Sequence, residues 1–206
     1  MNDRSDTNMR HEIIAGVLLF SAGVLAFLGI ITAETLYPGY STSQNMISDL
    51  GATEPPNSII IQPSSSIFSA SLAVCGLLVT VASYFVHRAF SRKSVSVLMG
   101  LFGVGVLGVG IFNGSYGTIH GIFALLAFIM SGLAAIASSR VERAPLNYFS
   151  AALGGIALLD LVLYYILGNA SPFAAFGLGG LERWIAYPVL LWVIGFGGYL
   201  MGHSKA

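Results

Sequence analysis

The chain has 206 residues, of which 55% are hydrophobic and only 9% are charged, and its formal net charge at pH 7 is zero. A soluble domain of this size cannot keep so much apolar surface from water, so the composition excludes a soluble globular protein and indicates an integral membrane protein. The single cysteine, Cys75, excludes an intramolecular disulfide, a zinc ribbon and a haem-attachment motif.

Six apolar segments follow one another, each close to the ~20 residues that a helix needs to cross the ~30 Å hydrocarbon core of a bilayer. We place them at about 13–33, 67–87, 95–113, 118–138, 148–168 and 183–202. The first segment is too long for the apolar part of a signal peptide, so we interpret it as a membrane span. The sequence therefore predicts an all-α fold, a polytopic membrane bundle of six transmembrane helices that forms one domain over residues 1–206.

The basic residues predict how the bundle is oriented. Lys and Arg in short loops favour the cytoplasmic side, and eight of the nine basic residues flank alternate spans. They are Arg4, Arg10, Arg88, Arg92, Lys93, Arg140, Arg143 and Lys205. We therefore expect a protein of the cell membrane with both termini in the cytoplasm and with the first long loop, 34–66, outside.

The 34–66 loop contains no Lys or Arg and is the only long connection. Residues 41–44 resemble a capping box, and Gly51 is placed to end a helix. The apolar residues between them share one helical face: Met46, Ile47 and Leu50. We expect a short amphipathic helix at about 43–50, lying at the outer interface.

Small residues mark faces along which spans two and three can pack closely, because helix association in lipid depends on close contact. At helical spacing the second span carries Ser69, Ala73, Gly76, Thr80 and Ser83, and the third carries Gly103, Gly110, Gly114 and Gly117. These stripes predict tight helix contacts.

The same spacing places two ionisable side chains inside the bundle. His120 continues a small-residue face of the fourth span, and Asp160, on such a face of the fifth, is the only acidic residue deep in a span. A charged carboxylate at that depth costs several kcal/mol unless it is paired, hydrated or protonated, so it is a functional candidate. The structural alternatives are a neutral Asp160 that hydrogen-bonds between helices and a His120 bonded to a carbonyl or to water.

Glu182 and Arg183 open the sixth span after the glycine-rich segment 177–180, which is a poor continuation of a helix. The glutamate suits a helix N-terminus, whereas the arginine opposes both the helix dipole and the charge rule. We expect Arg183 to form an ion pair or to hold an anionic headgroup or phosphate; an interfacial arginine that reaches the headgroups is the alternative. Its candidate acidic partners are Asp160, Glu34 and Asp49.

Polar candidates gather in the outer half of the predicted bundle and leave the cytoplasmic half apolar. We assign His120, Asp160 and Asp49 as candidate catalytic residues, with His120 as a general base. The candidate ligand-binding residues are Arg183, Glu182, Glu34, Tyr40, Asn113 and Tyr164. One histidine with carboxylates falls short of the usual zinc ligand set, so no metal ligand is assigned, and no cofactor is identified.

Several short motifs, in order along the chain, resemble those of an uncharacterised six-pass membrane family of archaea and bacteria, catalogued only as a domain of unknown function. They are 37–41 (Tyr-Pro-Gly-Tyr-Ser), 47–52 (Ile-Ser-Asp-Leu-Gly-Ala), His120-Gly121 and 180–183 (Gly-Leu-Glu-Arg). More distantly, the Ile-Ser-Asp-Leu-Gly turn and the histidine look like the DRAM-like six-pass proteins, which implies a role in membrane and lipid homeostasis. Neither resemblance implies a reaction.

Three functions fit these features, and they leave open whether the protein is an enzyme. The first is an outward-facing polar cavity that binds or modifies a lipid or a lipid-linked anionic molecule. The second is a proton-coupled small-molecule transporter in which Asp160 titrates, and the third is a non-catalytic scaffold or accessory subunit. The partners considered are the bilayer, a lipid or anionic headgroup, and a second copy of the chain; no nucleic acid is expected.

Overall fold

The computed structural model describes residues 3–203, and within this range it contains helices and loops but no strand. The long helices are α1 (Asp3–Thr35), α2 (Ser64–Phe90), α3 (Lys93–Ile111), α4 (Thr118–Ser138), α5 (Leu146–Leu167) and α6 (Gly177–His203). All six are long and apolar enough to cross a membrane. The predicted fold class is confirmed, and the chain is a multi-pass membrane protein. Of the basic residues used for the orientation, Lys205 lies outside the described range.

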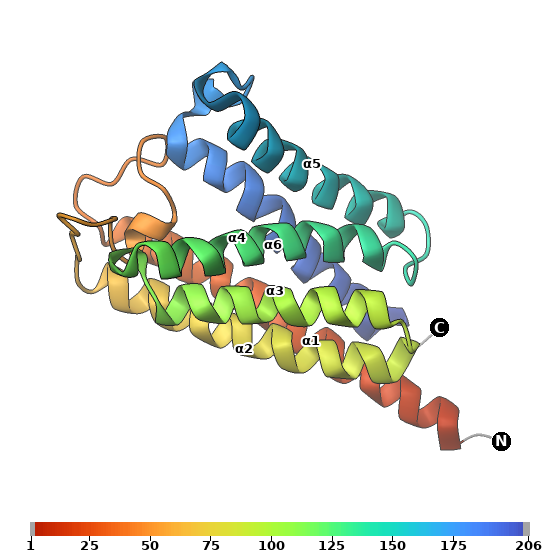
Figure 1. The fold of residues 1–206 in the computed structure, drawn as a ribbon. Helices are drawn as coiled ribbons and strands as arrows, with labels where there is room; N and C mark the ends of the chain where they lie inside the picture. Colours follow the sequence, from red (N-terminus) through yellow and green to blue (C-terminus); the bar gives the residue numbers. More distant parts are fainter. Residues whose placement is uncertain (1–2, 204–206) are drawn as a thin grey trace.

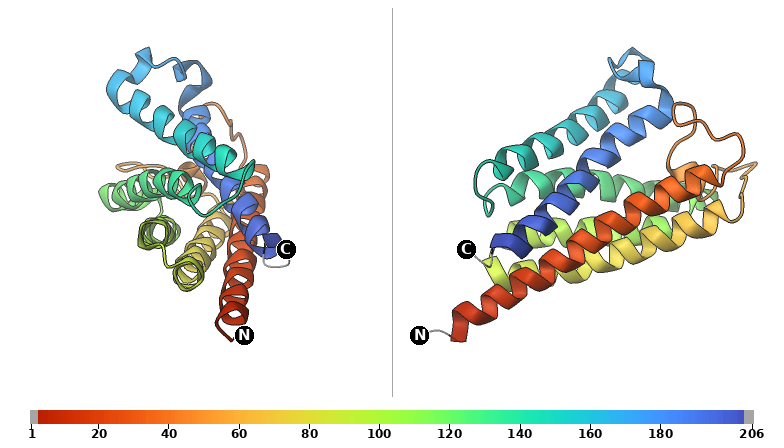
Figure 2. Two further views of the ribbon diagram at one scale, coloured as in Figure 1. Left: turned by 90° about the vertical axis from the view of Figure 1, so that its right-hand side faces the viewer. Right: turned by 180° about the vertical axis from the view of Figure 1, so that it is seen from behind.

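Consecutive helices pack against each other, and α6 also packs against α1, which closes the bundle. Figure 1 shows α1 beginning and α6 ending at the same end of the bundle, which we call the termini end. The opposite end, called the loop end, carries the connections 36–63, 112–117 and 168–176. From the other sides, α5 lies on the outside of the bundle (Figure 2), in contact with α4 and α6.

The contact between α2 and α3 depends on glycine, as the small-residue stripes predict. A Cβ atom on Gly76 would lie 2.6 Å from both the Gly103 carbonyl oxygen and the Leu107 Cα. On α3, a Cβ on Gly103 would lie 2.6 Å from the backbone nitrogen of Thr80. These neighbours are backbone atoms that cannot turn aside, so the two helices approach as closely as their backbones allow.

The connection 36–63, called the strap below, differs from the expected amphipathic helix. Its helical part is a single 3-10 turn, Ser48–Leu50, which ends at Gly51 as expected. The turn does not lie at an interface, because Ile47 and Leu50 are 5% and 0% exposed and belong to the core. The prediction of a helix over 43–50 is therefore wrong apart from its last turn.

Side chains that compete for backbone groups explain the shortened helix. The Asn45 side chain accepts the Ser41 N–H at 3.0 Å, and the Asp49 carboxylate accepts the Met46 N–H at 2.9 Å. Such local bonds offer the backbone an alternative to a helix. In a continued α-helix the Ser43 carbonyl would accept from residue 47, but it accepts the Gly179 N–H of α6 instead, at 3.0 Å.

Candidate functional site

Arg183, in the second turn of α6, holds the strap against the bundle. Its Nη2 makes a salt bridge of 2.5 Å with the Glu34 carboxylate at the end of α1 and donates to the Tyr40 hydroxyl at 2.8 Å. The Tyr40 hydroxyl in turn donates to the Met46 carbonyl at 2.7 Å. Burial raises the pKa of Tyr40 above its ordinary value, which keeps this hydroxyl protonated as a donor. Arg183 thereby links α1, α6 and the strap.

The other terminal nitrogen of Arg183, Nη1, is also occupied. It donates to the backbone carbonyls of Thr42, Asn45 and Gly179 at 2.8, 3.1 and 2.8 Å. Each terminal nitrogen carries two hydrogens, so the protein acceptors use all four of these donors. Only Nε, which is buried, has no hydrogen-bond partner. The arrangement explains Arg183 by internal bonds to Glu34 and the strap, and it leaves no terminal N–H for an added anion.

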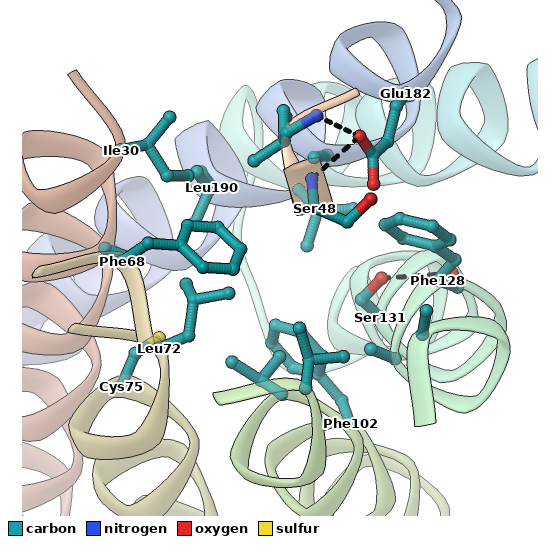
Figure 3. A pocket seen from close by; sticks show the side chains of 18 of the residues that line it. Ile30, Ser48, Phe68, Leu72, Cys75, Phe102, Phe128, Ser131, Glu182 and Leu190 are labelled. Atoms are coloured by element: carbon teal, nitrogen blue, oxygen red, sulfur yellow. Dashed lines mark hydrogen bonds between the residues drawn. The ribbon is translucent and has the colours of Figure 1, made fainter. Parts of the chain in front are cut away.

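Glu182, the residue before Arg183, binds the next part of the strap. Its Oε2 accepts the backbone N–H of Ile47 and, at 3.3 Å, that of Ser48. Figure 3 shows these two bonds and the second carboxylate oxygen of Glu182 pointing into a cavity. Adjacent residues of α6 therefore hold the strap at two places, and one of them also presents a carboxylate oxygen inside the bundle.

His120, in the first turn of α4, is 6% exposed. Its Nδ1 lies 2.7 Å from the Phe112 carbonyl oxygen at the end of α3. A carbonyl oxygen only accepts, so Nδ1 carries the proton and Nε2 is left as an acceptor in the neutral ring. The ring is thus held by a carbonyl, as in the structural alternative, and it forms no hydrogen bond to a carboxylate within the described residues.

An apolar cavity of about 90 Å³, the inner cavity, lies beneath the strap in the loop-end half of the bundle. Its wall includes Phe68, Leu72, Cys75, Phe102, Phe128 and Leu190. Figure 3 shows the phenylalanine rings around the space and Ser48 and Glu182 together at one edge. The polar groups that line this cavity come mainly from the strap (Ser48), from α4 (His120) and from the start of α6 (Glu182).

A second cavity of about 160 Å³, the side cavity, lies between α4, α5, α6 and the strap. Its lining includes Glu54, Gly121, Leu125, Leu161, Tyr164 and Leu181. The inner and side cavities share five lining residues: Ser48, His120, Ala124, Phe128 and Glu182. We call this shared set the junction. An apolar pocket therefore adjoins a more polar one, with a histidine and a carboxylate where they meet.

Asp160 is fully buried, as its small-residue face predicts, but it lines neither the inner nor the side cavity. Neither carboxylate oxygen has a hydrogen-bond partner among the described residues. Asp160 therefore forms no hydrogen bond with His120 and no ion pair with Arg183 within the described residues.

The other predicted site residues divide between the cavity and local structure. Tyr164 lines the side cavity. Asp49 accepts the Met46 N–H, and burial raises its pKa above the ordinary value, an effect that this hydrogen bond only partly offsets. The Asn113 side chain accepts the Ser115 N–H at 3.2 Å and its hydroxyl at 2.6 Å. Asp49 and Asn113 therefore stabilise turns at the loop end.

The termini end holds a buried polar group that the sequence analysis missed. Glu142, in the link between α4 and α5, is 8% exposed, and its Oε1 lies 2.9 Å from the Ser138 hydroxyl. That hydroxyl accepts the Trp192 indole N–H at 2.9 Å, and burial raises the pKa of Glu142 above its ordinary value. The expectation of an apolar bundle at this end is wrong here; the four-residue spacing of Ser138 and Glu142 was the available signal.

A family model described as "Protein of unknown function (DUF998)" matches residues 20–199. This match agrees with the uncharacterised six-pass family that the short motifs resemble, whereas the more distant likeness to the DRAM-like proteins gains no support from it. No curated protein and no solved structure matches the chain. Any functional assignment must therefore rest on the geometry of the cavities.

Proposed function

We propose a function from the site itself, because the chain belongs to the DUF998 family, which is described as proteins of unknown function. The protein binds an amphiphile, a lipid or a lipid-linked molecule, in the joined inner and side cavities. The observation that carries this proposal is the junction, where His120 and Glu182 lie between an apolar and a more polar pocket. Sites for small molecules are typically concave and apolar, with few polar groups that fix the ligand's orientation.

The two cavities suit the two parts of an amphiphile. The inner cavity, with its phenylalanine rings, takes an apolar chain or its end, and the junction holds the polar group. The side cavity lies against α5, whose Tyr165 is 68% exposed. We therefore expect the ligand to enter sideways from the bilayer, between α4 and α5, and not along the axis of the helix bundle.

Binding is favoured over chemical modification of the ligand. Chemistry on a ligand typically pairs a base with a nucleophile or a second ionisable group. The Phe112 carbonyl orients His120, but no carboxylate among the described residues is hydrogen-bonded to its ring: Asp49 accepts the Met46 N–H, and Asp160 has no hydrogen-bond partner. We therefore assign His120 and Glu182 to ligand binding.

The proposed orientation puts the loop end, and with it the junction, outside the cytoplasm. It rests on the basic residues near the termini end: Arg10, Arg88, Arg92, Lys93, Arg140 and Arg143. A bilayer then surrounds the exposed apolar side chains of the six helices, and the ligand is drawn from the outer leaflet.

Filling the side cavity should weaken amphiphile binding without unfolding the protein. A Cβ atom on Gly121 meets no atom of another element within 4 Å, so a side chain can begin there without a clash, and the position lines the side cavity. In purified protein we expect Gly121→Leu to weaken the thermal stabilisation by added single-chain lipids by about tenfold in apparent affinity, equivalent to ~1.4 kcal/mol.

The matched control is Gly155→Leu on α5, where a Cβ is equally free of contacts and which lines neither cavity. It should keep the wild-type response. If no single-chain lipid stabilises the wild type, or if both variants respond alike, the cavity is not a binding site and the scaffold function is favoured.

Proton-coupled transport is the second candidate, and the buried, unpartnered carboxylate of Asp160 favours it. An ionisable group inside a membrane bundle typically marks a proton or ion pathway. In liposomes under a pH gradient, the wild type should carry a proton flux that Asp160→Asn reduces to the level of empty liposomes. A flux unchanged in Asp160→Asn, or absent from the wild type, would exclude Asp160 as a proton carrier.

A further inference from the structure

The proposed binding site raises the question of which polar group the junction accepts. Resting on that proposed function, we infer that the ligand is an amphiphile with a primary ammonium headgroup, held at Glu182 and His120. Three features of the described residues support this: the polar atoms at the junction are mainly acceptors, no basic side chain lines the two cavities, and Arg183 is bound to Glu34 and the strap.

The free polar atoms of the junction are mainly acceptors. The His120 ring uses its Nδ1–H on the Phe112 carbonyl, so its neutral form offers the lone pair of Nε2. The Glu182 carboxylate uses Oε2 for the backbone N–H groups of Ile47 and Ser48, and its other oxygen points into the inner cavity (Figure 3). A ligand that complements these atoms must donate hydrogen bonds.

The charged residues that line the cavities also favour a cationic ligand. Glu54 adds a second carboxylate to the side cavity, and no Lys or Arg of the described part of the chain lines either cavity. Arg183 is the one basic residue of the loop end among the described residues, and its salt bridge to Glu34 offsets one acidic charge there. Neither Glu54 nor Glu182 forms a salt bridge within the described residues, so their carboxylates favour a cation in the cavities over a phosphate or carboxylate.

A primary ammonium satisfies both requirements, because it carries a positive charge and three N–H donors. A trimethylammonium group has the charge without donors, and a sugar hydroxyl has donors without the charge. Charge-assisted hydrogen bonds are the stronger kind, so the three headgroups should differ in affinity even on identical chains. The amine is supplied by a membrane aminophospholipid or by a free long-chain amine.

The test compares decyl chains that carry primary ammonium, trimethylammonium, maltoside or phosphate headgroups, each titrated below its micelle concentration against the purified full-length chain. We expect decylammonium to bind about tenfold more tightly than decyltrimethylammonium or decylmaltoside, and decylphosphate to bind most weakly. Glu182→Gln should remove this preference, because its amide oxygen still accepts the strap N–H groups while the charge is lost.

Glu54→Gln supplies a second variant in case Glu182→Gln does not fold, because Glu54 is exposed and outside the helices. It should weaken decylammonium by a few-fold and leave decylmaltoside unchanged. The control for a change of charge in the strap is Asn57→Asp, because Asn57 does not line the side cavity. Thr53→Val, next to Glu54, is unsuitable as a control because the Thr53 hydroxyl accepts the Ile59 N–H.

The outcomes separate the inference from the proposed function. If no decyl compound binds, the proposed function fails and the headgroup assignment fails with it. If decylmaltoside or decylphosphate binds as tightly as decylammonium, the site exists but the ammonium assignment is overturned. Native mass spectrometry from mixed vesicles of phosphatidylethanolamine, phosphatidylglycerol and phosphatidylcholine then identifies the source. Enrichment of phosphatidylethanolamine indicates a membrane lipid, and decylammonium binding without that enrichment indicates a free amine; both agree with the inference.

Discussion

Replacing Arg183 with methionine is expected to lower the free energy of unfolding by roughly 3–5 kcal/mol, the cost of breaking a buried ion pair from one side. The Arg183 and Glu34 side chains are only 10% and 16% exposed, so water cannot readily replace the lost partner. The change also removes the bonds from Nη1 to the carbonyls of Thr42 and Asn45 in the strap, to which no backbone N–H of the described residues donates. Thermal unfolding in detergent should show a melting temperature lower by roughly 6–20 °C.

Two further variants make the Arg183 experiment specific. Arg143→Met, at an exposed position of the termini end, should shift the melting temperature by little, because exposed charges contribute little. Glu34→Gln in the Arg183→Met background should recover part of the loss, since it removes the unpaired carboxylate. If Arg183→Met lowers the free energy of unfolding by less than about 1 kcal/mol, the Arg183–Glu34 pair contributes no more than an ordinary surface salt bridge. That result would contradict the conclusion that Arg183 holds the strap against the bundle.

Adding one methyl group at Gly76 is expected to cost roughly 3 kcal/mol, at the upper end of the usual range for overpacked cores. The alanine Cβ would lie 2.6 Å from the Gly103 carbonyl oxygen and the Leu107 Cα, so α2 and α3 must move apart. The apolar side chains around this contact then lose packing along the whole interface. Thermal unfolding of Gly76→Ala in detergent measures the effect.

Gly198→Ala in α6 is the matched control, because a Cβ there meets no atom within 4 Å. Alanine is the better helix former, so this variant should be neutral or slightly more stable than the wild type. Equal melting temperatures for Gly76→Ala and Gly198→Ala would show that α2 and α3 are less closely packed than the structure indicates.

Much of the fold could be predicted because membrane spans are determined by length and apolarity, which a sequence displays directly. Helix faces could also be predicted, since small residues recur at helical spacing where backbones must approach; Gly76 and Gly103 show this. The sequence predicts the sixth span from residue 183, whereas α6 begins at Gly177. Residues 177–180 are helical, and their glycines allow the strap to approach closely. At Gly179 a Cβ would lie 2.5 Å from the Thr42 carbonyl oxygen.

The shape of the strap and the details of the site could not be predicted from local patterns. Glu182 and Gly179 lie far from the strap in sequence, yet they take the backbone groups that a helix over 43–50 would have used. Likewise, Arg183 had three acidic candidates at a similar depth, and only the packing of α1 against α6 selects Glu34. Long-range contacts of this kind leave no periodic signal in one sequence.

The contacts of Glu182 and Arg183 with the strap have a kinetic consequence. Glu182 and Arg183 hold it on both sides of Met46, so the strap cannot swing away unless the salt bridge and several hydrogen bonds break together. We therefore expect the cover of the inner cavity to move together with the first turns of α6. For the ligand proposed above, exchange is then expected between α4 and α5, and its rate should follow the lateral pressure and chain order of the surrounding lipid more than the composition of the aqueous phase.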